Sequence, residues 1–395
     1  MQIKNNLRKV HIIMKNFHIN TEIYFGEDAL SRLSQLEYKS VIIICDPFVQ
    51  SSGMITLITN RLDAVGIDYD IFTDVVPDPP VEKVINGVAK VLTSRPPCII
   101  TVGGGSAIDT AKAIRKFAAQ IQEDYFPHLI AIPTTSGTGS EVTCFAVISN
   151  PAEGRKYPLA AEDLIPDEAI LDEVLVKSVP ASVTADTGMD VMTHAVEAYV
   201  STNNNEFSGA LAEKAVEITG QFLIRSYSSC EDTHARRKMH IASCLAGLAF
   251  NSASLGLNHG MAHQLGANFH IPHGRANAML LPYIIEFNSG IRLTHRSQRE
   301  YPSCVRKYCN LARILGVSNM NEVTTIRALI SYMHFLNSEM GIPSRVSEAC
   351  PNLTKEEYEA ALDKMAFAAL QDGCTATNPR TPLKNDIIEI YKKIW

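Results

Sequence analysis

Several features are missing from this 395-residue sequence, and each absence excludes a class of protein. No run of about 18 apolar residues occurs, so no membrane-spanning helix is predicted. The nine cysteines are scattered without a C-x-x-C pair, which argues against a disulfide framework and for reduced thiols in a cytoplasmic protein. Basic residues form no long run beyond the first few positions, and the net charge of −6 argues against a nucleic-acid partner.

The composition that remains is that of an ordinary soluble globular protein, with 46% hydrophobic and 20% charged residues. The length predicts two domains with ample core. The first 20 residues are basic, but their apolar patches are too short for a secretory signal. Residues 1–13 fit a short amphipathic helix, and the alternative is a frayed tail or a start at Met14.

The first half of the chain alternates between strand and helix patterns. Apolar, mostly β-branched runs predict strands at residues 41–45, 68–72, 98–102 and 129–133. Apolar residues at helical spacing predict helices at residues 51–67, 81–94 and 107–120. This alternation is typical of a Rossmann-like α/β domain, a doubly wound parallel sheet covered by helices.

Beyond Pro180 the strand patterns end and helical patterns dominate. The clearest helices are predicted at residues 184–201, 205–226, 232–252 and 257–268. We therefore expect an α/β domain of residues 1–183 followed by an all-α domain of residues 184–395, with the active site in the cleft between them. No internal repeat and no low-complexity segment interrupts either half.

A glycine-rich turn, Gly103-Gly104-Gly105-Ser106, joins the predicted strand 98–102 to the next helix. Glycines let the backbone approach an anion, and the helix N-terminus offers free N–H groups and the positive end of a dipole. The turn is not G-x-G-x-x-G, and a turn of this kind is more often only a tight turn. Its position between a buried strand and a helix favours phosphate binding.

Two further features suit a dinucleotide. The loop that begins at Thr134 offers hydroxyls and backbone N–H groups directly after the strand 129–133. Asp46 ends the strand 41–45, where a carboxylate accepts hydrogen bonds from a ribose diol and repels a 2′-phosphate. This favours NAD over NADP, although a helix or turn cap is an equally good explanation of Asp46.

Histidines are concentrated in one segment of the second half. Four of the 12 histidines fall within residues 259–273. An even spread of histidines along the chain would place roughly half a histidine in a segment of that length. Asp190 and His194 are four apart on one predicted helix, as are His259 and His263 on another, so each pair shares a face. With His273 they indicate a metal site with an open position, but spacing alone does not select which of these five side chains bind.

Five stretches of the sequence resemble the iron-containing (group III) alcohol dehydrogenases, and the resemblance runs from about Phe25 to the C-terminus. They are GGGSAIDTAKAI, AIPTTSGTGSEVT, PDEAILD, TGMDVMTHAVEAYVS and NHGMAHQLGANFHIPHGRANAMLLP. Within this family, NSASLGLNHGMAHQLGANFHIPHG and TNPRTP are most similar to the 1-propanol and ethanol dehydrogenases of bacterial microcompartments.

The resemblance implies roles for individual residues. It implies metal ligands at Asp190, His194, His259 and His273. It places His263 beside the nicotinamide as a catalytic residue and gives His270 no role. It implies that the cofactor NAD(H) is bound by Asp46, Gly104, Gly105, Ser106, Asp109, Thr134, Thr135, Thr143 and Lys156.

The predicted substrate pocket departs from one branch of the family. Relatives that reduce lactaldehyde have an asparagine where this chain has Phe145, and Phe250 matches another wall of the pocket. A buried hydroxyl of a diol would lack a partner between two phenylalanines, so a plain short alkyl chain is expected.

The function that these features imply is an NAD-linked alcohol dehydrogenase that interconverts a short-chain primary alcohol and its aldehyde, such as 1-propanol and propanal or ethanol and acetaldehyde. Three imidazoles and one carboxylate suit Fe(II), with Zn(II) as the alternative. The rival interpretations are another metal-dependent enzyme of this architecture, similar to glycerol dehydrogenase or dehydroquinate synthase, and a non-catalytic microcompartment cargo. The four intact ligand positions argue against the last.

The resemblance also implies partners and a location. Family members are often dimers or larger, so a homo-oligomer is expected. The expected location is the cytoplasm, with enclosure in a bacterial microcompartment and contact with its shell or cargo proteins. In that case the extra N-terminal segment would be an encapsulation peptide. Nucleic acid and membrane are not expected as partners.

Overall fold

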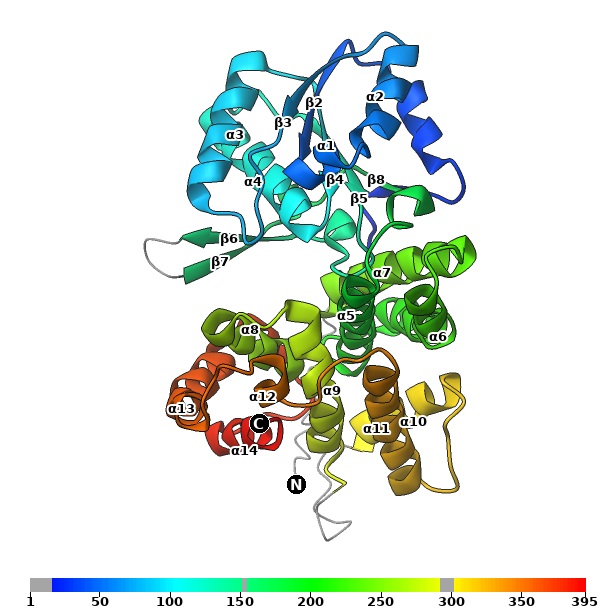
Figure 1. Ribbon diagram of the computed structural model, residues 1–395, viewed down its shortest axis with the longest axis vertical. Helices are drawn as coiled ribbons and strands as arrows, with labels where there is room; N and C mark the ends of the chain where they lie inside the picture. The colour runs from blue at the N-terminus through cyan, green and yellow to red at the C-terminus, as the bar shows by residue number, and fades with distance from the viewer. Residues whose placement is uncertain (1–15, 151–154, 292–301) are drawn as a thin grey trace, which may run out of the picture.

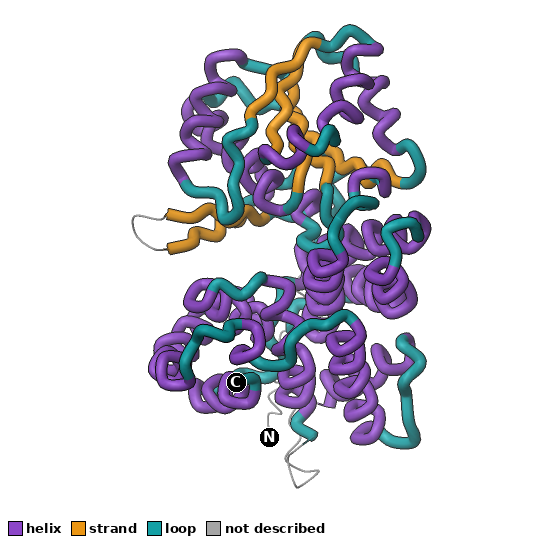
Figure 2. Tube along the Cα trace, in the orientation of Figure 1, coloured by secondary structure: helices purple, strands orange, loops and turns teal. Residues whose placement is uncertain are grey.

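The computed structural model of this chain describes residues 16–150, 155–291 and 302–395. The prediction for residues 1–13 therefore lies outside the described residues. Figure 1 shows an α/β half, which contains the N-terminal part of the chain, above a helical half, and Figure 2 shows that the strands are confined to the first of these. This arrangement confirms the expected fold class.

The α/β half is built on a six-stranded parallel sheet with the order β1-β8-β5-β4-β2-β3. Its strands are β1 (Glu22–Phe25), β2 (Ser40–Cys45), β3 (Asp68–Phe72), β4 (Cys98–Gly103), β5 (His128–Pro133) and β8 (Glu168–Leu171). The four strands predicted from apolar runs are β2 to β5. Strands β1 and β8 were not predicted, because each has only four residues, too few to show an apolar run or a period.

Helices cover both faces of this sheet, as the alternating side chains of the strands require. Ile42 and Ile44 of β2 pack in one apolar cluster with α3 (Val81–Ser94) and α4 (Gly105–Ile121). Ile43 of β2 packs in another cluster with a 3-10 helix, η1 (Ala29–Gln35), and with α2 (Ile55–Ala64). Burial on both faces explains why these strands read as continuous apolar runs.

A two-stranded antiparallel hairpin, β6 (Phe145–Asn150) and β7 (Arg155–Ala160), projects from the edge of the α/β half that faces the helical half (Figure 1). This hairpin was not predicted from the sequence. Its strands mix polar and apolar residues, and Pro158 interrupts the second strand, so neither shows a clear strand pattern.

The helical half begins with α5, and each of the four helices predicted above for this half is present. Its helices of ten or more residues are α5 (Ala181–Val200), α6 (Glu206–Ser228), α7 (Thr233–Ala253), α8 (Leu257–Phe269), α9 (His273–Ser289), α10 (Pro302–Ile314), α11 (Glu322–Glu339), α13 (Lys355–Gln371) and α14 (Lys384–Lys393). A short helix, α12 (Val346–Ala349), lies between α11 and α13.

Helix α9 joins two apolar cores in this half. Leu281 and Ile285 pack in the core that contains α5, α6, α7, α10 and α11. Met279 and Leu280 pack in the core that contains α8, α13 and α14. Because residues of α9 pack in both cores, the position of this helix is fixed relative to α5 and α8. The first turn of α9 lies where α5 and α8 also come together (Figure 1).

Among the described helices, none is by itself long and apolar enough to cross a membrane. Helices α7 and α8 meet that test of length and composition only as a pair, and they are bent by 108° at their junction.

Candidate metal and cofactor site

Three helices bring four potential metal-binding side chains together. Asp190 and His194 come from α5, His259 from α8, and His273 is the first residue of α9. One ligand atom from each lies within 4.8 Å of every other. The first three are buried, whereas the His273 side chain is 43% exposed and opens the cluster on one side.

The donor atoms of this cluster fit a cation. Asp190 Oδ1, His259 Nε2 and His273 Nε2 all face the side-chain nitrogen of Asn277, at 2.7, 3.1 and 3.1 Å. An amide nitrogen has two hydrogens and cannot satisfy three acceptors at once, whereas one cation accepts a lone pair from each. Three imidazoles and a carboxylate are ligands for a divalent first-row metal such as iron or zinc.

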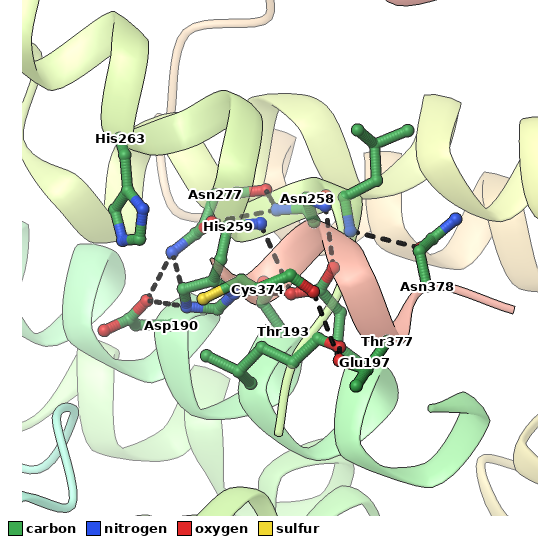
Figure 3. Close-up of polar contacts among 12 residues, drawn as sticks. Asp190, Thr193, Glu197, Asn258, His259, His263, Asn277, Cys374, Thr377 and Asn378 are labelled. Carbon is green, nitrogen blue, oxygen red and sulfur yellow. Dashed lines mark hydrogen bonds and ion pairs between the residues drawn. The ribbon is translucent and has the colours of Figure 1, made fainter. Parts of the chain in front are cut away.

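Asn277 was missed by the sequence analysis, although a signal was present. It lies four residues after His273, so both side chains lie on one face of α9. Asn258 Nδ2 donates to Asn277 Oδ1 at 2.9 Å, which turns the amide nitrogen of Asn277 toward the cluster (Figure 3).

Burial favours the neutral form of the two buried imidazoles of the cluster, those of His194 and His259. Removal from water lowers the pKa of His259 well below its usual value, and the neighbouring His194, His273 and His263 lower it further. Burial also lowers the pKa of His194, against the opposing effect of the Asp190 carboxylate. A neutral imidazole offers the lone pair that a metal ion requires.

A buried glutamate on α5 supports His259 and was also missed. Glu197 Oε2 lies 2.5 Å from His259 Nδ1, and both side chains are almost fully buried. Burial raises the pKa of Glu197 to about 8, although backbone N–H groups at the start of α8 oppose this. Its spacing from His194 places it on the same face of α5, but a glutamate in a helix carries no distinctive sequence signal.

His263 lies one turn beyond His259 on α8 and is not part of the four-residue cluster. Its Nδ1 lies 2.7 Å from Asp372 Oδ2, and its side chain is 41% exposed. Its ring is stacked near that of His273, with centroids 5.4 Å apart. His263 therefore lies at the exposed side of the cluster, and Asp372 orients its ring. His270 is exposed and ends α8 with a left-handed backbone, φ 56°.

The two predicted pocket phenylalanines lie beside the cluster. The Phe250 ring is stacked on His194, with centroids 4.5 Å apart, and the Phe145 ring follows at 6.4 Å from that of Phe250. Phe145 begins β6 of the α/β half, whereas Phe250 lies on α7. This row of rings reaches from the α/β half to the candidate metal ligands.

The glycine-rich turn and the following loop lie side by side. Gly104 caps α4, and Gly105 and Ser106 form its first turn. A Cβ on Gly105 would approach Thr138 Cγ2 to 2.9 Å, so a larger residue would push the two loops apart. The Thr134 N–H donates to Gly103 O at 3.0 Å, and Thr135 Oγ1 lies near Gly104.

Asp46 stands where the strand order reverses. The chain runs from β2 outward to β3 and then returns to β4 on the other side of β2, and ligands of such sheets bind at the carboxyl ends of strands there. Asp46 follows β2 and caps α1 (Pro47–Ser51), accepting the Val49 N–H at 3.0 Å. The cap is thus present, and contact with a ribose remains a prediction.

For three further predicted cofactor residues, Asp109, Thr143 and Lys156, the structure describes only contacts within the protein. Asp109 is half-buried, and its carboxylate accepts hydrogen bonds from Ser140 Oγ at 2.6 Å and from the Val147 N–H at 3.0 Å. Thr143 is buried, and its carbonyl oxygen accepts from Lys112. Lys156 lies in β7 opposite Ser149. Their direct contact with a cofactor stays a prediction.

The sequence matches the descriptions of a known protein family over most of its length. The family description "Iron-containing alcohol dehydrogenase" matches residues 20–173, and "Fe-containing alcohol dehydrogenase family, C-terminal" matches residues 184–395. The chain is 42% identical over 387 residues to 1-propanol dehydrogenase PduQ of Citrobacter freundii, covering 96% of this chain and 100% of the relative.

Two further comparisons extend over nearly the whole chain. The NADPH-dependent butanol dehydrogenase of Clostridium saccharobutylicum is 36% identical, with 97% of this chain and 98% of the relative covered. The crystal structure of a 1,3-propanediol oxidoreductase superposes with a TM-score of 0.87 at 30% identity, and covers 97% of this chain and all of that chain.

Proposed function

Because this chain belongs to the iron-containing alcohol dehydrogenase family, we propose that it interconverts a short-chain primary alcohol and its aldehyde with NAD(H) as the hydride carrier. The observation that carries this proposal is the convergence of Asp190, His194, His259 and His273 on one point beside two phenylalanines. Propanal and 1-propanol are the proposed substrate pair, in line with the similarity to a 1-propanol dehydrogenase.

Each part of the site has a distinct task in this proposal. A divalent metal ion held by the four ligands supplies Lewis acidity toward the substrate oxygen. Phe145 and Phe250 exclude water from the alkyl chain and leave no hydrogen-bond partner for a second hydroxyl. His263 is oriented by Asp372 and open to solvent, and in this proposal it lies beside the nicotinamide ring.

The cofactor is proposed to bind across the carboxyl ends of β2, β4 and β5. The pyrophosphate suits the N-terminus of α4 at Gly104 and Gly105, where backbone N–H groups are free of helical partners. Asp46 suits a ribose diol and repels the 2′-phosphate of NADP, so NAD is proposed, in contrast to the NADPH named for the butanol dehydrogenase relative.

Iron is the proposed metal, with zinc as the alternative. Three imidazoles and a carboxylate accept both ions, and the general order of affinities favours zinc over ferrous iron. The family to which the chain belongs supports iron. Metal content of the protein purified without oxygen decides between them.

The experiment that tests the proposal is NADH oxidation with propanal, catalysed by anaerobically purified protein loaded with Fe(II). His259→Ala should abolish turnover because it removes a buried candidate ligand. His270→Asn is the matched control, since it changes a histidine of the same segment and asparagine tolerates a left-handed backbone. Turnover should survive in the control and vanish on chelation.

Two outcomes would contradict different parts of the proposal. If NADH binds but no short aldehyde reacts with Fe(II) or Zn(II), the substrate assignment is wrong. If NADH does not bind, the dehydrogenase assignment itself is wrong.

We also propose a homo-oligomer that works inside a microcompartment. The support is sequence similarity to the 1-propanol dehydrogenase PduQ, and the N-terminal residues concerned lie outside the described part of the chain. Fusing residues 1–20 to a fluorescent reporter in a host that builds such compartments tests the location. Diffuse fluorescence would contradict it, and light scattering reports the oligomeric state.

A further inference from the structure

Glu197 connects two features of the site that the proposed function leaves unexplained: how α8 begins, and which nitrogen of His259 faces the ligand cluster. It lies on α5, and its side chain is only 3% exposed. Figure 3 shows its carboxylate between the start of α8 and the ring of His259.

The carboxylate caps α8 from another helix. The N-cap residue of α8 is Gly256, which has no side chain that could accept a hydrogen bond from the helix. The Glu197 carboxylate supplies the acceptor in its place. The Asn258 N–H donates to Glu197 Oε1 at 2.7 Å, and the His259 N–H donates to Oε2 at 3.3 Å. A Cβ on Gly256 would lie 2.7 Å from Oε1, so glycine is required for the carboxylate to approach. The first free N–H groups of a helix prefer an anionic acceptor of this kind.

The same carboxylate faces the imidazole of His259. Glu197 Oε2 lies 2.5 Å from Nδ1, while the amide nitrogen of Asn277 faces Nε2 at 3.1 Å. When Glu197 is ionised, its carboxylate accepts a hydrogen bond from Nδ1 and therefore keeps the ring proton on that nitrogen. The selected tautomer directs the lone pair of Nε2 into the ligand cluster, and the amide nitrogen that faces Nε2 is compatible with it.

We propose that Glu197 is a positioning residue of the metal site, which fixes the tautomer and orientation of His259 so that Nε2 is the ligand atom. The inference rests on the proposed function only in taking the cluster to bind a metal ion. Outer carboxylates of this kind orient metal-binding histidines and raise their basicity. Glu197 differs from a simple partner of His259 because it also holds the backbone from which that histidine projects.

The test is the affinity of the full-length protein for Zn(II) alone, measured by competition with a chromophoric chelator. Glu197→Gln preserves the size of the side chain and one oxygen acceptor for the α8 backbone. Its amide group, however, donates toward Nδ1 of His259 and moves the ring proton onto Nε2, where it blocks metal binding. We expect Zn(II) binding to weaken roughly 10- to 100-fold.

Glu213→Gln is the matched control. Glu213 is a glutamate of the same half whose carboxylate accepts from the Tyr199 hydroxyl at 2.5 Å and from Asn310 Nδ2 at 2.6 Å, and neither partner is a candidate ligand. This variant should bind Zn(II) like the wild type. Thermal unfolding of the metal-free proteins separates a loss of helix capping, which lowers stability, from a loss of affinity in protein that is still folded.

A second measurement needs no variant of Glu197 to fold. Nitrogen-15 NMR of histidine-labelled, metal-free wild type above pH 8, where the Glu197 carboxyl is ionised, should show the His259 proton on Nδ1, with His259→Asn to assign the signal. A proton on Nε2, or equal Zn(II) affinity in wild type and Glu197→Gln, would overturn the inference and leave the proposed function intact. Wild-type protein that binds no metal would overturn both.

Discussion

Under the proposed function, Phe145 is the side chain that selects which alcohol the site accepts. Its ring follows that of Phe250, which in turn is stacked on the candidate ligand His194. In the proposed site, an alcohol's carbon chain would therefore meet aromatic atoms beyond the cluster. A hydroxyl on the second carbon of the substrate would lose its hydrogen bonds to water without gaining a partner.

Phe145→Asn should shift the preference from 1-propanol toward 1,2-propanediol. The asparagine amide supplies a partner for the second hydroxyl and removes apolar surface from the alkyl chain. We expect the ratio of kcat/KM for the diol to that for 1-propanol to rise roughly tenfold or more. Steady-state kinetics with both alcohols and NAD measure it.

The control for this experiment is Phe367→Asn on α13, where the phenylalanine is exposed on the surface. It should leave the ratio unchanged. A ratio that is also unchanged in Phe145→Asn would show that Phe145 does not contact the substrate.

At the scale of elements, α4 holds the loop that leads to the predicted substrate pocket. Lys112 Nζ donates to the backbone oxygens of Thr143 and Phe145, both at 2.8 Å, from a fully buried position. Asp109, one turn earlier, accepts from Ser140 and from the Val147 N–H. The helix that begins at the glycine-rich turn thereby positions a predicted cofactor residue and a wall of the pocket together.

Lys112→Met should loosen this loop. Two buried carbonyl groups lose their donor, at a cost of about 1–3 kcal/mol each, and the loop rearranges to recover hydrogen bonds. We expect the KM values for NADH and propanal to rise several-fold. Lys116→Met is the control, because Lys116 lies one turn further on α4 and pairs with Asp163 near the surface. Equal KM values in the two variants would refute this role of Lys112.

Glu168 connects β8 to its surroundings through charge. Arg32 donates two hydrogen bonds to its carboxylate, at 2.9 and 2.8 Å, and His128 lies 3.1 Å away. Burial acts to raise the pKa of Glu168, but these partners together lower it to about 2. The stabilisation is therefore present above the usual pKa of a glutamate, about 4.5, and is lost as the pH falls toward 2.

Glu168→Gln should destabilise the protein at pH 6.5 by roughly 2 kcal/mol and progressively less as the pH falls below 4.5. The reason is that the wild-type carboxylate becomes protonated and approaches the variant. Urea unfolding of both proteins at several pH values measures the difference. A difference in unfolding free energy that does not depend on pH would show that Glu168 acts through shape and not through charge.

At the scale of the whole molecule, the proposed site draws on both halves. The predicted cofactor positions lie on the α/β half, and the candidate ligands lie on α5, α8 and α9. The halves touch closely where Gly139 meets Gly247 of α7, since a Cβ on Gly139 would lie 2.6 Å from the Gly247 Cα. Binding at the site should therefore stabilise the folded molecule.

Metal ion and NADH should each raise the melting temperature. A ligand at 100 times its dissociation constant stabilises the folded state by about 2.7 kcal/mol, which corresponds to a few degrees for a protein of this size. His259→Ala should abolish the shift caused by Zn(II) and retain the shift caused by NADH, because the metal ligands and the cofactor turn lie on different halves. Loss of both shifts in the variant would mean that NADH needs the metal to bind. Differential scanning fluorimetry measures both.

The sequence alone determined the α/β-then-helical order of the chain, the strands β2 to β5, and the helices α5 and α8, which carry three of the four candidate ligands. Each rests on a local pattern: an apolar run, a helical period, or glycines between a strand and a helix. The concentration of histidines in residues 259–273 and their helical spacing likewise indicate a metal site from local pattern alone.

Only the tertiary structure decided which side chains meet. The pairing of β1 with β8, the hairpin β6–β7, and the contacts of Glu197, Asn258, Asn277 and Asp372 join residues that are far apart or carry no local pattern. The physical reason is that periodicity records which face of an element is buried, whereas a hydrogen bond between elements depends on how they pack. His259 and Glu197, 62 residues apart in the chain, are neighbours only because α5 and α8 come together.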